Sequence, residues 1–247
     1  MKIAVISDIH GNKDALDAVF EDINAQECDM IFALGDYAMA GPQPSDLVNW
    51  FMERENKKNF KIIQGNTDYM IANYSEKLYE ELKAKAPIMA EALKNDVETL
   101  NFLQKDFLKN LPSQYNIELD GVKFLLVHGS PRKNNEDILP DTPLKEVEKM
   151  VENSNADVIL CGHTHIPCGF QTENKKTIVN VGSVGRPFTE KPRSCYLKIT
   201  LVNGQCVFEH RFVDYNIEKA ASRLRRRKFS GADKLADMLH NPELRHF

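Results

Sequence analysis

Two histidines stand two residues apart in the segment VILCGHTHIP, directly after an apolar run. Imidazole nitrogens are common metal ligands, but a buried histidine is more often an ordinary core residue, so His163 and His165 alone do not decide between the two. Asp8 and His10 have the same spacing after the apolar run near the N-terminus. Side chains alternate along an extended segment, so residues two apart can point to the same side and hold one ion. Each pair is therefore a candidate for metal binding.

Side chains that bind metals also follow the other apolar runs of the chain. Asp36 comes just after MIFAL, Asn66 just after FKIIQ and His128 directly after KFLLV. In an α/β sheet, ligands gather at the carboxyl ends of the strands, so residues from most of the chain can converge there. Histidines that only fill the core would not be expected to lie at the carboxyl ends of strands. We therefore expect these residues to converge on one patch, and they are Asp8, His10, Asp36, Asn66, His128, His163 and His165.

The elements that must hold these residues are visible in the hydrophobic pattern, because apolar strand-like runs alternate with helical periods. Helices are expected at about 13–25, capped by Asn12, and at 45–55. A longer helical segment at about 69–110 is divided by Pro87. Strands are expected at 2–7, 30–34, 60–64, 113–119, 122–127, 157–161, 168–172, 176–181, 194–202 and 206–213. This order predicts an α/β protein with two packed sheets, helices outside them and a helical insertion.

Length and composition are those of an ordinary globular protein. The 247 residues can build one sizeable core, and a formal net charge of −4 gives no sign of a nucleic-acid coat. The short apolar run at the N-terminus is interrupted by Ser7 and Asp8, so it predicts neither a signal peptide nor a membrane span. Five cysteines without a C-x-x-C pair predict reduced thiols. We therefore expect a cytoplasmic protein with no membrane partner.

Two units are expected along the chain. Residues 1–216 carry the candidate ligands and form the main domain, and residues 217–247 form a C-terminal helical tail. The tail lies beyond the part that carries the motifs, so the chemistry is expected to survive without it. Its run RLRRRK is more typical of a solvated helix face than of a phosphate-contacting patch. Nucleic acid is therefore not favoured as a partner, but it stays open, as does the oligomeric state.

The polar segments at the strand ends form an ordered series of short motifs. In chain order they are D-x-H at 8–10, G-D at 35–36, G-N-x-D at 65–68, H-G at 128–129 and G-H-x-H at 162–165. This series resembles the calcineurin-like metallophosphoesterase superfamily. The segment NVGSVGRP at 180–187 is similar to one in the small bacterial and archaeal phosphodiesterase branch of that superfamily. The resemblance runs to about residue 190 and implies a four-layer α/β/β/α sandwich of two mixed sheets.

The resemblance also implies a centre of two divalent metal ions. Carried over residue by residue, the first ion would be held by Asp8, His10, Asp36 and His165. The second would be held by Asp36, Asn66, His128 and His163, which makes Asp36 the bridge. No side chain is assigned as the catalytic nucleophile, because the resemblance implies attack on phosphorus by a hydroxide that bridges the metals. Imidazole and oxygen ligands bind several divalent metals, so we expect Mn, with Fe, Zn, Ni and Co as the alternatives.

The substrate is expected to be a small phosphorylated molecule that contacts Asn66. Arg186 is either a bidentate contact for the substrate phosphate or a surface arginine beside Pro187. Asp68 is expected to cap its loop rather than to bind metal. Many family members have histidine after the asparagine of G-N-x-D, where it helps to protonate the leaving group, whereas this chain has Thr67. Threonine cannot titrate in that role. The change therefore favours phosphodiesters or phosphoanhydrides over ordinary monoesters.

Three other functions stay open. A serine/threonine protein phosphatase and a dinucleoside polyphosphate hydrolase are the enzymatic alternatives. A metal-binding scaffold protein is the alternative without catalysis, but such a protein should have lost ligands, and here all seven ligand positions are filled. We therefore expect a metal-dependent phosphoesterase.

Overall fold

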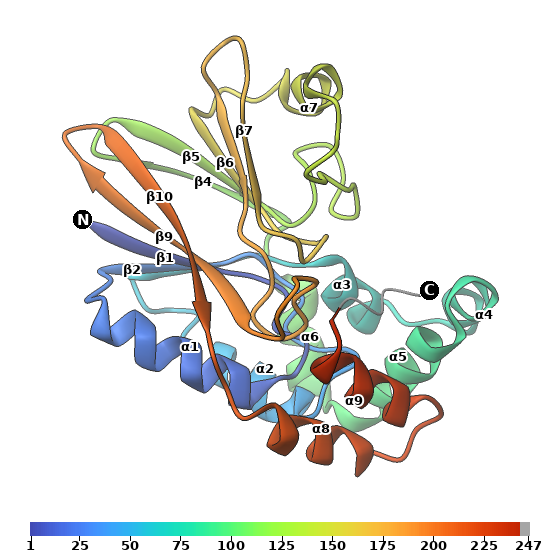
Figure 1. Cartoon of the computed structure of the whole chain (residues 1–247). Coiled ribbons are helices and arrows are strands. Elements are labelled where there is room, and N and C mark those ends of the chain that lie inside the picture. The colour runs from blue at the N-terminus through green and yellow to red at the C-terminus, as the bar shows by residue number, and fades with distance from the viewer. Residues whose placement is uncertain (243–247) are drawn as a thin grey trace.

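The computed structural model describes residues 1–242, which form two five-stranded sheets packed against each other (Figure 1). The strand order is β10-β9-β1-β2-β3 in the first sheet and β4-β5-β6-β8-β7 in the second. The first sheet contains β1 (Lys2–Ile6), β2 (Met30–Ala33), β3 (Phe60–Ile62), β9 (Ser194–Val202) and β10 (Gln205–Val213). The second contains β4 (Gln114–Leu119), β5 (Val122–Val127), β6 (Val158–Cys161), β7 (Cys168–Gln171) and β8 (Thr177–Asn180). Every strand predicted from the sequence is present.

Both sheets are mixed, because each contains parallel and antiparallel neighbours. In the first sheet, β1 and β3 pair in parallel with β2, whereas β9 is antiparallel to β1. In the second sheet, β6 pairs in parallel with β5 and β8, and the edge strands β4 and β7 are antiparallel. The parallel strands of each sheet therefore end at a common edge, and the loops with the candidate ligands begin there.

Helices cover the outer faces of the sheets, as Figure 1 shows for α1 and α2 on the first sheet and α7 on the second. The helices are α1 (Lys13–Ala25), α2 (Pro44–Met52), α3 (Asn66–Ala72), α4 (Glu76–Lys85), α5 (Pro87–Thr99), α6 (Phe102–Asn110), α7 (Leu144–Val151), α8 (Ile217–Arg225) and α9 (Ala232–His240). This arrangement confirms the predicted α/β/β/α sandwich of two mixed sheets. Helices α3 to α6 occupy the segment predicted as a helical insertion.

The alternation of side chains along β1 divides the core into layers. Ile3 and Val5 face the second sheet, whereas Ala4 and Ile6 face the helices on the other side. Both faces of the strand are buried, which explains why its sequence is a continuous apolar run rather than an alternating one. The first polar side chains after such a strand lie in the loop at its end.

Local signals in the sequence fix the helices beside these loops. Oδ1 of Asn12 accepts a hydrogen bond from the backbone N–H of Ala15 at 3.2 Å and so caps α1, as predicted. Pro87 occupies the first turn of α5 and separates that helix from α4, also as predicted. Both helices lie beside loops that carry candidate ligands.

The tail helices α8 and α9 share a core with the first sheet. Ala220 and Leu224 of α8 belong to the same buried cluster as Leu16 of α1, and so do Leu235 and Leu239 of α9. Removing the tail would expose this apolar surface to water, which is unfavourable. The domain boundary between residues 216 and 217 stays a prediction. The shared core indicates that the tail contributes to the stability of the main domain.

Two expectations about the environment concern the thiols and the membrane. All five cysteines are free, as their number and spacing predicted. Among residues 1–242, no helix combines the length and the apolar character that crossing a membrane requires.

Candidate metal centre

Loops from both sheets meet at one edge of the sandwich and carry the predicted ligands. Asp8 and His10 follow β1, Asp36 follows β2, Asn66 follows β3, His128 follows β5, and His163 and His165 follow β6. Five of them have positive φ angles, namely Asp8 (55°), His10 (47°), Asp36 (56°), His163 (69°) and His165 (63°). Residues with a Cβ rarely adopt this conformation, and it persists only where the surrounding structure imposes it. The surrounding structure therefore holds the backbone of these five residues in an unfavourable conformation, which sets the direction of their side chains.

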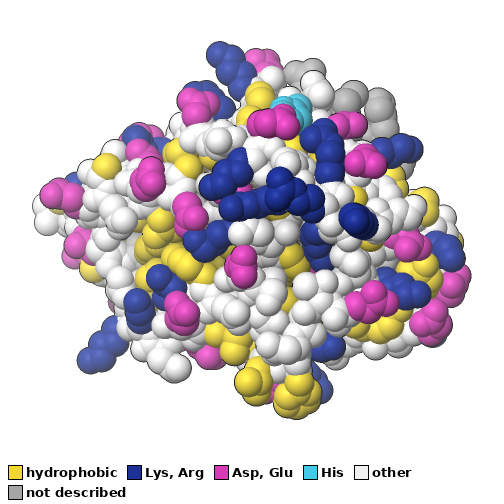
Figure 2. Space-filling model, turned by 90° about the horizontal axis from the view of Figure 1, so that it is seen from below, with side chains coloured by type: hydrophobic (Ala, Val, Ile, Leu, Met, Phe, Trp, Pro, Cys, Tyr) yellow, Lys and Arg dark blue, Asp and Glu magenta, His cyan; other side chains and the backbone are white. Residues whose placement is uncertain are grey.

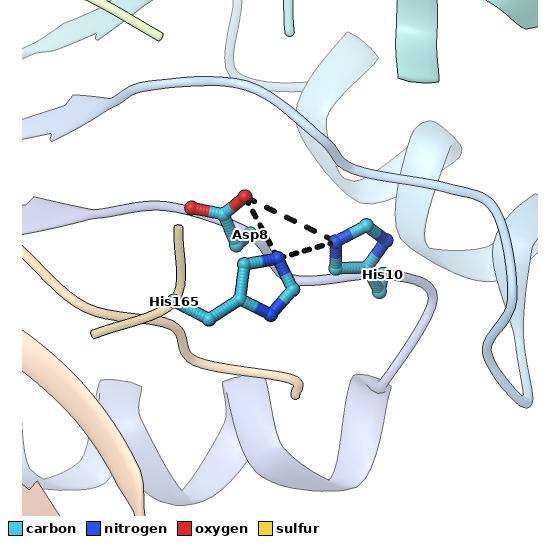
Figure 3. A group of neighbouring side chains, drawn as sticks. All are labelled: Asp8, His10 and His165. Atoms are coloured by element: carbon cyan, nitrogen blue, oxygen red, sulfur yellow. Dashed lines mark hydrogen bonds and ion pairs between the residues drawn. The ribbon is translucent and has the colours of Figure 1, made fainter. Parts of the chain in front are cut away.

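Asp8, His10 and His165 form the first group of candidate ligands, and their side chains point toward one another (Figure 3). Nε2 of His165 lies 3.2 Å from Oδ1 of Asp8 and 3.2 Å from Nε2 of His10. The other ring nitrogens are occupied, because Nδ1 of His10 donates to the carbonyl of Met39 at 2.9 Å and Nδ1 of His165 donates to that of Arg186 at 2.6 Å. The Nε2 atoms of His10 and His165 therefore face each other and Oδ1 of Asp8, an arrangement that a cation between them would stabilise.

Asp8, Asp36 and His128 form the second group. Nε2 of His128 lies 3.4 Å from Oδ2 of Asp36, 3.8 Å from Oδ1 of Asp8 and 2.9 Å from Oδ1 of Asn66. Nδ1 of His128 donates to the carbonyl of Leu34 at 2.7 Å, which directs Nε2 to the same oxygens. This group thus has the composition of a second divalent-metal site.

The two groups are joined by both aspartates. Oδ2 of Asp36 lies 3.7 Å from Nε2 of His10 and 3.4 Å from Nε2 of His128, so it faces an imidazole of each group. Oδ1 of Asp8 is buried and has no hydrogen-bond donor among residues 1–242, although three imidazole nitrogens lie within 3.9 Å of it. A buried carboxylate oxygen without a donor is costly unless a cation compensates it. Both observations fit metal ions, and the assignment of Asp36 as the bridge stays a prediction.

His163 lies beside the second group rather than inside it. Its ring centroid is 5.3 Å from that of His128, and its Nε2 is 3.3 Å from Oδ1 of Asp137. Its backbone N–H donates to Oδ2 of Asp8 at 2.9 Å, so its loop is tied to the centre. Its role as a metal ligand stays a prediction. Asp137 was missed by the sequence analysis, because it lies in the irregular loop between β5 and α7 and no motif marks it.

The negative charges of Asp8 and Asp36 are compensated mainly by His128, as the pKa values of these residues indicate. Burial lowers the pKa of His128, but Asp36 and Asp8 raise it by more, to about 10. Burial raises the pKa of Asp36, but the charge of His128 outweighs it and the pKa falls to about 2. The pKa of Asp8 lies far below its ordinary value, because His165 and His128 outweigh the effect of burial. Burial, and then His165, lowers the pKa of His10 to about 3. Without metal, a proton on His128 therefore compensates two carboxylates.

The loop after β3 is held against Asp36 by close contacts. A Cβ on Gly65 would lie 2.0 Å from Oδ1 of Asp36, so no other residue fits there without moving that carboxylate. The N–H of Thr67 donates to the same oxygen at 2.9 Å. Asp68 accepts hydrogen bonds from the N–H groups of Asp36, Tyr37 and Gly65 at 2.8, 3.0 and 2.9 Å, which confirms it as a loop cap. Burial and Asp36 raise the pKa of Asp68 to about 7, against the effect of these N–H donors.

The two expected substrate contacts lie at the centre. Oδ1 of Asn66 faces His128, as described above. Arg186 is buried beside His165, and its Nη1 lies 3.8 Å from the sulfur of Met89 on α5. Phe188 stacks on the ring of His165 at a centroid distance of 4.9 Å. Contact of Asn66 or Arg186 with a substrate stays a prediction.

Two mixed sheets in an α/β/β/α sandwich, with adjacent groups of imidazoles and carboxylates at the strand ends, define the metallophosphoesterase class of protein. In agreement with this, residues 1–204 match the family model of the calcineurin-like phosphoesterase superfamily domain, and the chain belongs to that superfamily. It is thus a metal-dependent phosphoesterase, a hydrolase, which disfavours the scaffold alternative.

Similar proteins come from bacteria and archaea. An uncharacterized protein of Methanocaldococcus jannaschii, MJ0912, is 29% identical in an alignment that covers 90% of this chain and 91% of that protein. The crystal structure of a metallophosphoesterase from Sphaerobacter thermophilus is 25% identical, with a TM-score of 0.78 over 97% of this chain and 98% of that one. Hypothetical protein PH1004 from Pyrococcus horikoshii is 21% identical, with a TM-score of 0.86 over 97% of each chain, and shares the fold.

Proposed function

We propose that this protein is a dinuclear-metal phosphoesterase that hydrolyses phosphodiester or phosphoanhydride bonds. The observation that carries the proposal is the pair of three-residue groups that share Asp8. Each group joins buried carboxylate oxygens to imidazole nitrogens. Adjacent sites of this composition suit a pair of divalent cations.

The proposed ligand sets are those that the family resemblance implies, and the two groups with the residues beside them support the sets. The first ion would be held by Asp8, His10, Asp36 and His165, and the second by Asp36, Asn66, His128 and His163. When bound, two such ions supply Lewis acids for the phosphoryl oxygens and lower the pKa of a water molecule. The chain itself orients the imidazoles, because the carbonyls of Met39, Arg186 and Leu34 accept from His10, His165 and His128. Such contacts fix the ring tautomers and support metal affinity.

The proposed metal is Mn, and Fe, Zn, Ni or Co fit the same donor set, because the two groups contain nitrogen and oxygen atoms but no thiolate. We place the protein in the cytoplasm, since five free cysteines fit a reducing compartment.

The substrate class follows from the position of Thr67. Its hydroxyl donates to the carbonyl of Ala38 at 3.3 Å, and the side chain is buried, so it offers no titratable group to a leaving oxygen. Without a positioned acid, the leaving group must carry off its own negative charge. Small diesters and phosphoanhydrides with acidic leaving groups therefore fit better than alkyl monoesters. Dinucleoside polyphosphates belong to this class, whereas phosphoserine in a protein does not.

The test is a substrate panel on metal-stripped protein with Mn added back. We expect two ions per chain, no turnover without metal, and faster hydrolysis of aryl diesters and phosphoanhydrides than of alkyl monoesters. His165→Asn should abolish turnover. The matched control His240→Asn should not, because His240 at the end of α9 is partly exposed and pairs with Glu218 of α8. Turnover without metal would refute the proposal, and fastest hydrolysis of a phosphoserine peptide would favour a protein phosphatase instead.

A further inference from the structure

The basic run RLRRRK at the end of α8 contains two kinds of arginine. Figure 2 shows lysine and arginine side chains gathered on the face seen from below, on the side where α8 lies in Figure 1. Arg223 pairs with Asp14 at 2.6 Å and Arg225 with Asp237 at 2.7 Å, and both arginines are about one-third exposed. These two behave as expected of a solvated helix face. Arg227 does not, because only 9% of its side chain is exposed.

Arg227 forms an ion pair with a fully buried carboxylate of the helical insertion. Its Nη1 lies 2.5 Å from Oδ1 of Asp96, which is on α5 and has no exposed surface. The same nitrogen donates to the carbonyl of Gly41 at 2.8 Å. Oδ2 of Asp96 accepts from the N–H of Met39 at 2.6 Å. The pair therefore holds both ends of the segment 39–41.

This segment needs to be held, because its conformation is unfavourable. Met39 and Ala40 have φ angles of 78° and 64°, which residues with side chains rarely adopt. The segment also packs closely against the backbone of a candidate ligand, since a Cβ on Gly41 would lie 1.5 Å from the carbonyl oxygen of His10. The carbonyl of Met39 accepts from Nδ1 of His10 at 2.9 Å. A continuous set of contacts thus joins the tail arginine to the first group of candidate ligands.

We propose that Arg227 and Asp96 are positioning residues that fix the Met39 carbonyl, and through it the His10 imidazole, for the first metal ion. The inference rests on the proposed function, because it takes His10 as a ligand of that ion. Contacts to the second nitrogen of a metal-binding imidazole set its tautomer and direction. His128 is the internal comparison, because its Nδ1 donates to the carbonyl of Leu34, which directly follows β2 and lies outside the segment 39–41.

The test compares Arg227→Met with the control Arg225→Met, which removes an exposed ion pair of the same tail. In metal-free protein labelled with ¹⁵N-histidine, the Nδ1–H protons of His10 and His128 should both be protected from exchange. Arg227→Met should remove protection at His10 and leave it at His128. Its affinity for the first metal ion should fall about 10- to 100-fold, with the second ion little affected. Arg225→Met should match the parent in every measurement, and Arg227→Lys should restore part of the affinity.

Removing one partner of a buried ion pair can unfold a protein, so a second variant removes both charges. Replacing a buried ion pair by apolar residues is often neutral for stability. Asp96→Leu with Arg227→Met should therefore fold, yet it lacks the acceptor for Met39 and the donor for Gly41. We expect it to lose His10 protection and first-site affinity. A folded double variant with parental His10 protection and metal binding would overturn the inference. Failure of the parent to bind metal would refute the proposed function instead, and the His10 signal would still test the contact.

Discussion

Metal binding by this protein should become tighter as pH rises from 7 to 8.5, because a proton must leave His128. Its pKa is about 10 in the metal-free protein, raised above the ordinary value by Asp36 and Asp8 against the effect of burial. The protonated imidazole cannot be a ligand, so at pH 7, about three pH units below that pKa, metal binding must displace a proton from His128. Between pH 7 and 8.5 the affinity of the second ion should rise about 30-fold.

The other ligands with altered pKa values should contribute nothing to this dependence. The pKa of His10 is about 3 and that of Asp36 about 2, so both have already lost their protons at pH 7. Calorimetric titration of stripped protein with Mn, in two buffers of different ionisation enthalpy, counts the protons released. We expect at least one proton per chain. In the metal-free protein, Asp36→Asn should lower the pKa of His128, because it removes a carboxylate that raises it. An affinity that stays constant from pH 7 to 8.5, without proton release, would refute this account of the charges.

Four further predictions concern single features. Asp36→Asn should lower metal content and turnover together, and near-normal hydrolysis with two ions per chain would contradict the dinuclear assignment. Thr67→His should selectively raise monoester hydrolysis, by up to the 10²- to 10⁴-fold range of general acid catalysis. A graded set of leaving groups measures this, and brisk alkyl monoester hydrolysis by the parent would contradict it. The metal-free protein should lose stability in thermal unfolding as pH rises from about 6.5 to about 10. The pKa of His128 is raised from 6.5 to about 10 by folding, so its stabilising contribution is complete below 6.5 and is lost as pH rises through the folded-state pKa. Leu224→Ala should lower the free energy of unfolding, measured with urea, by about 2–5 kcal/mol. A smaller decrease would mean that the tail packs loosely.

The helices, the strands and the positions of the candidate ligands could be predicted from the order of the amino acids alone. A strand such as β1 is buried on both faces, so it leaves a continuous apolar run, and the polar residues of the site come directly after it. The cap at Asn12 and the break at Pro87 are local in the same way, since each depends on neighbours a few residues away. These features could be predicted because their causes lie within one short segment.

Which side chains contact one another could be seen only after the chain was folded. His10 and His165 are 155 residues apart, and their 3.2 Å contact depends on how two sheets pack at one edge. The contact between Asp137 and His163 had no signal in the sequence, because a loop without periodicity carries no record of what it touches. Arg227 looks like its exposed neighbours in the sequence, yet its side chain is buried, because it pairs with the buried carboxylate of Asp96 on α5. Such pairings depend on the relative placement of distant elements, and no local pattern encodes that placement.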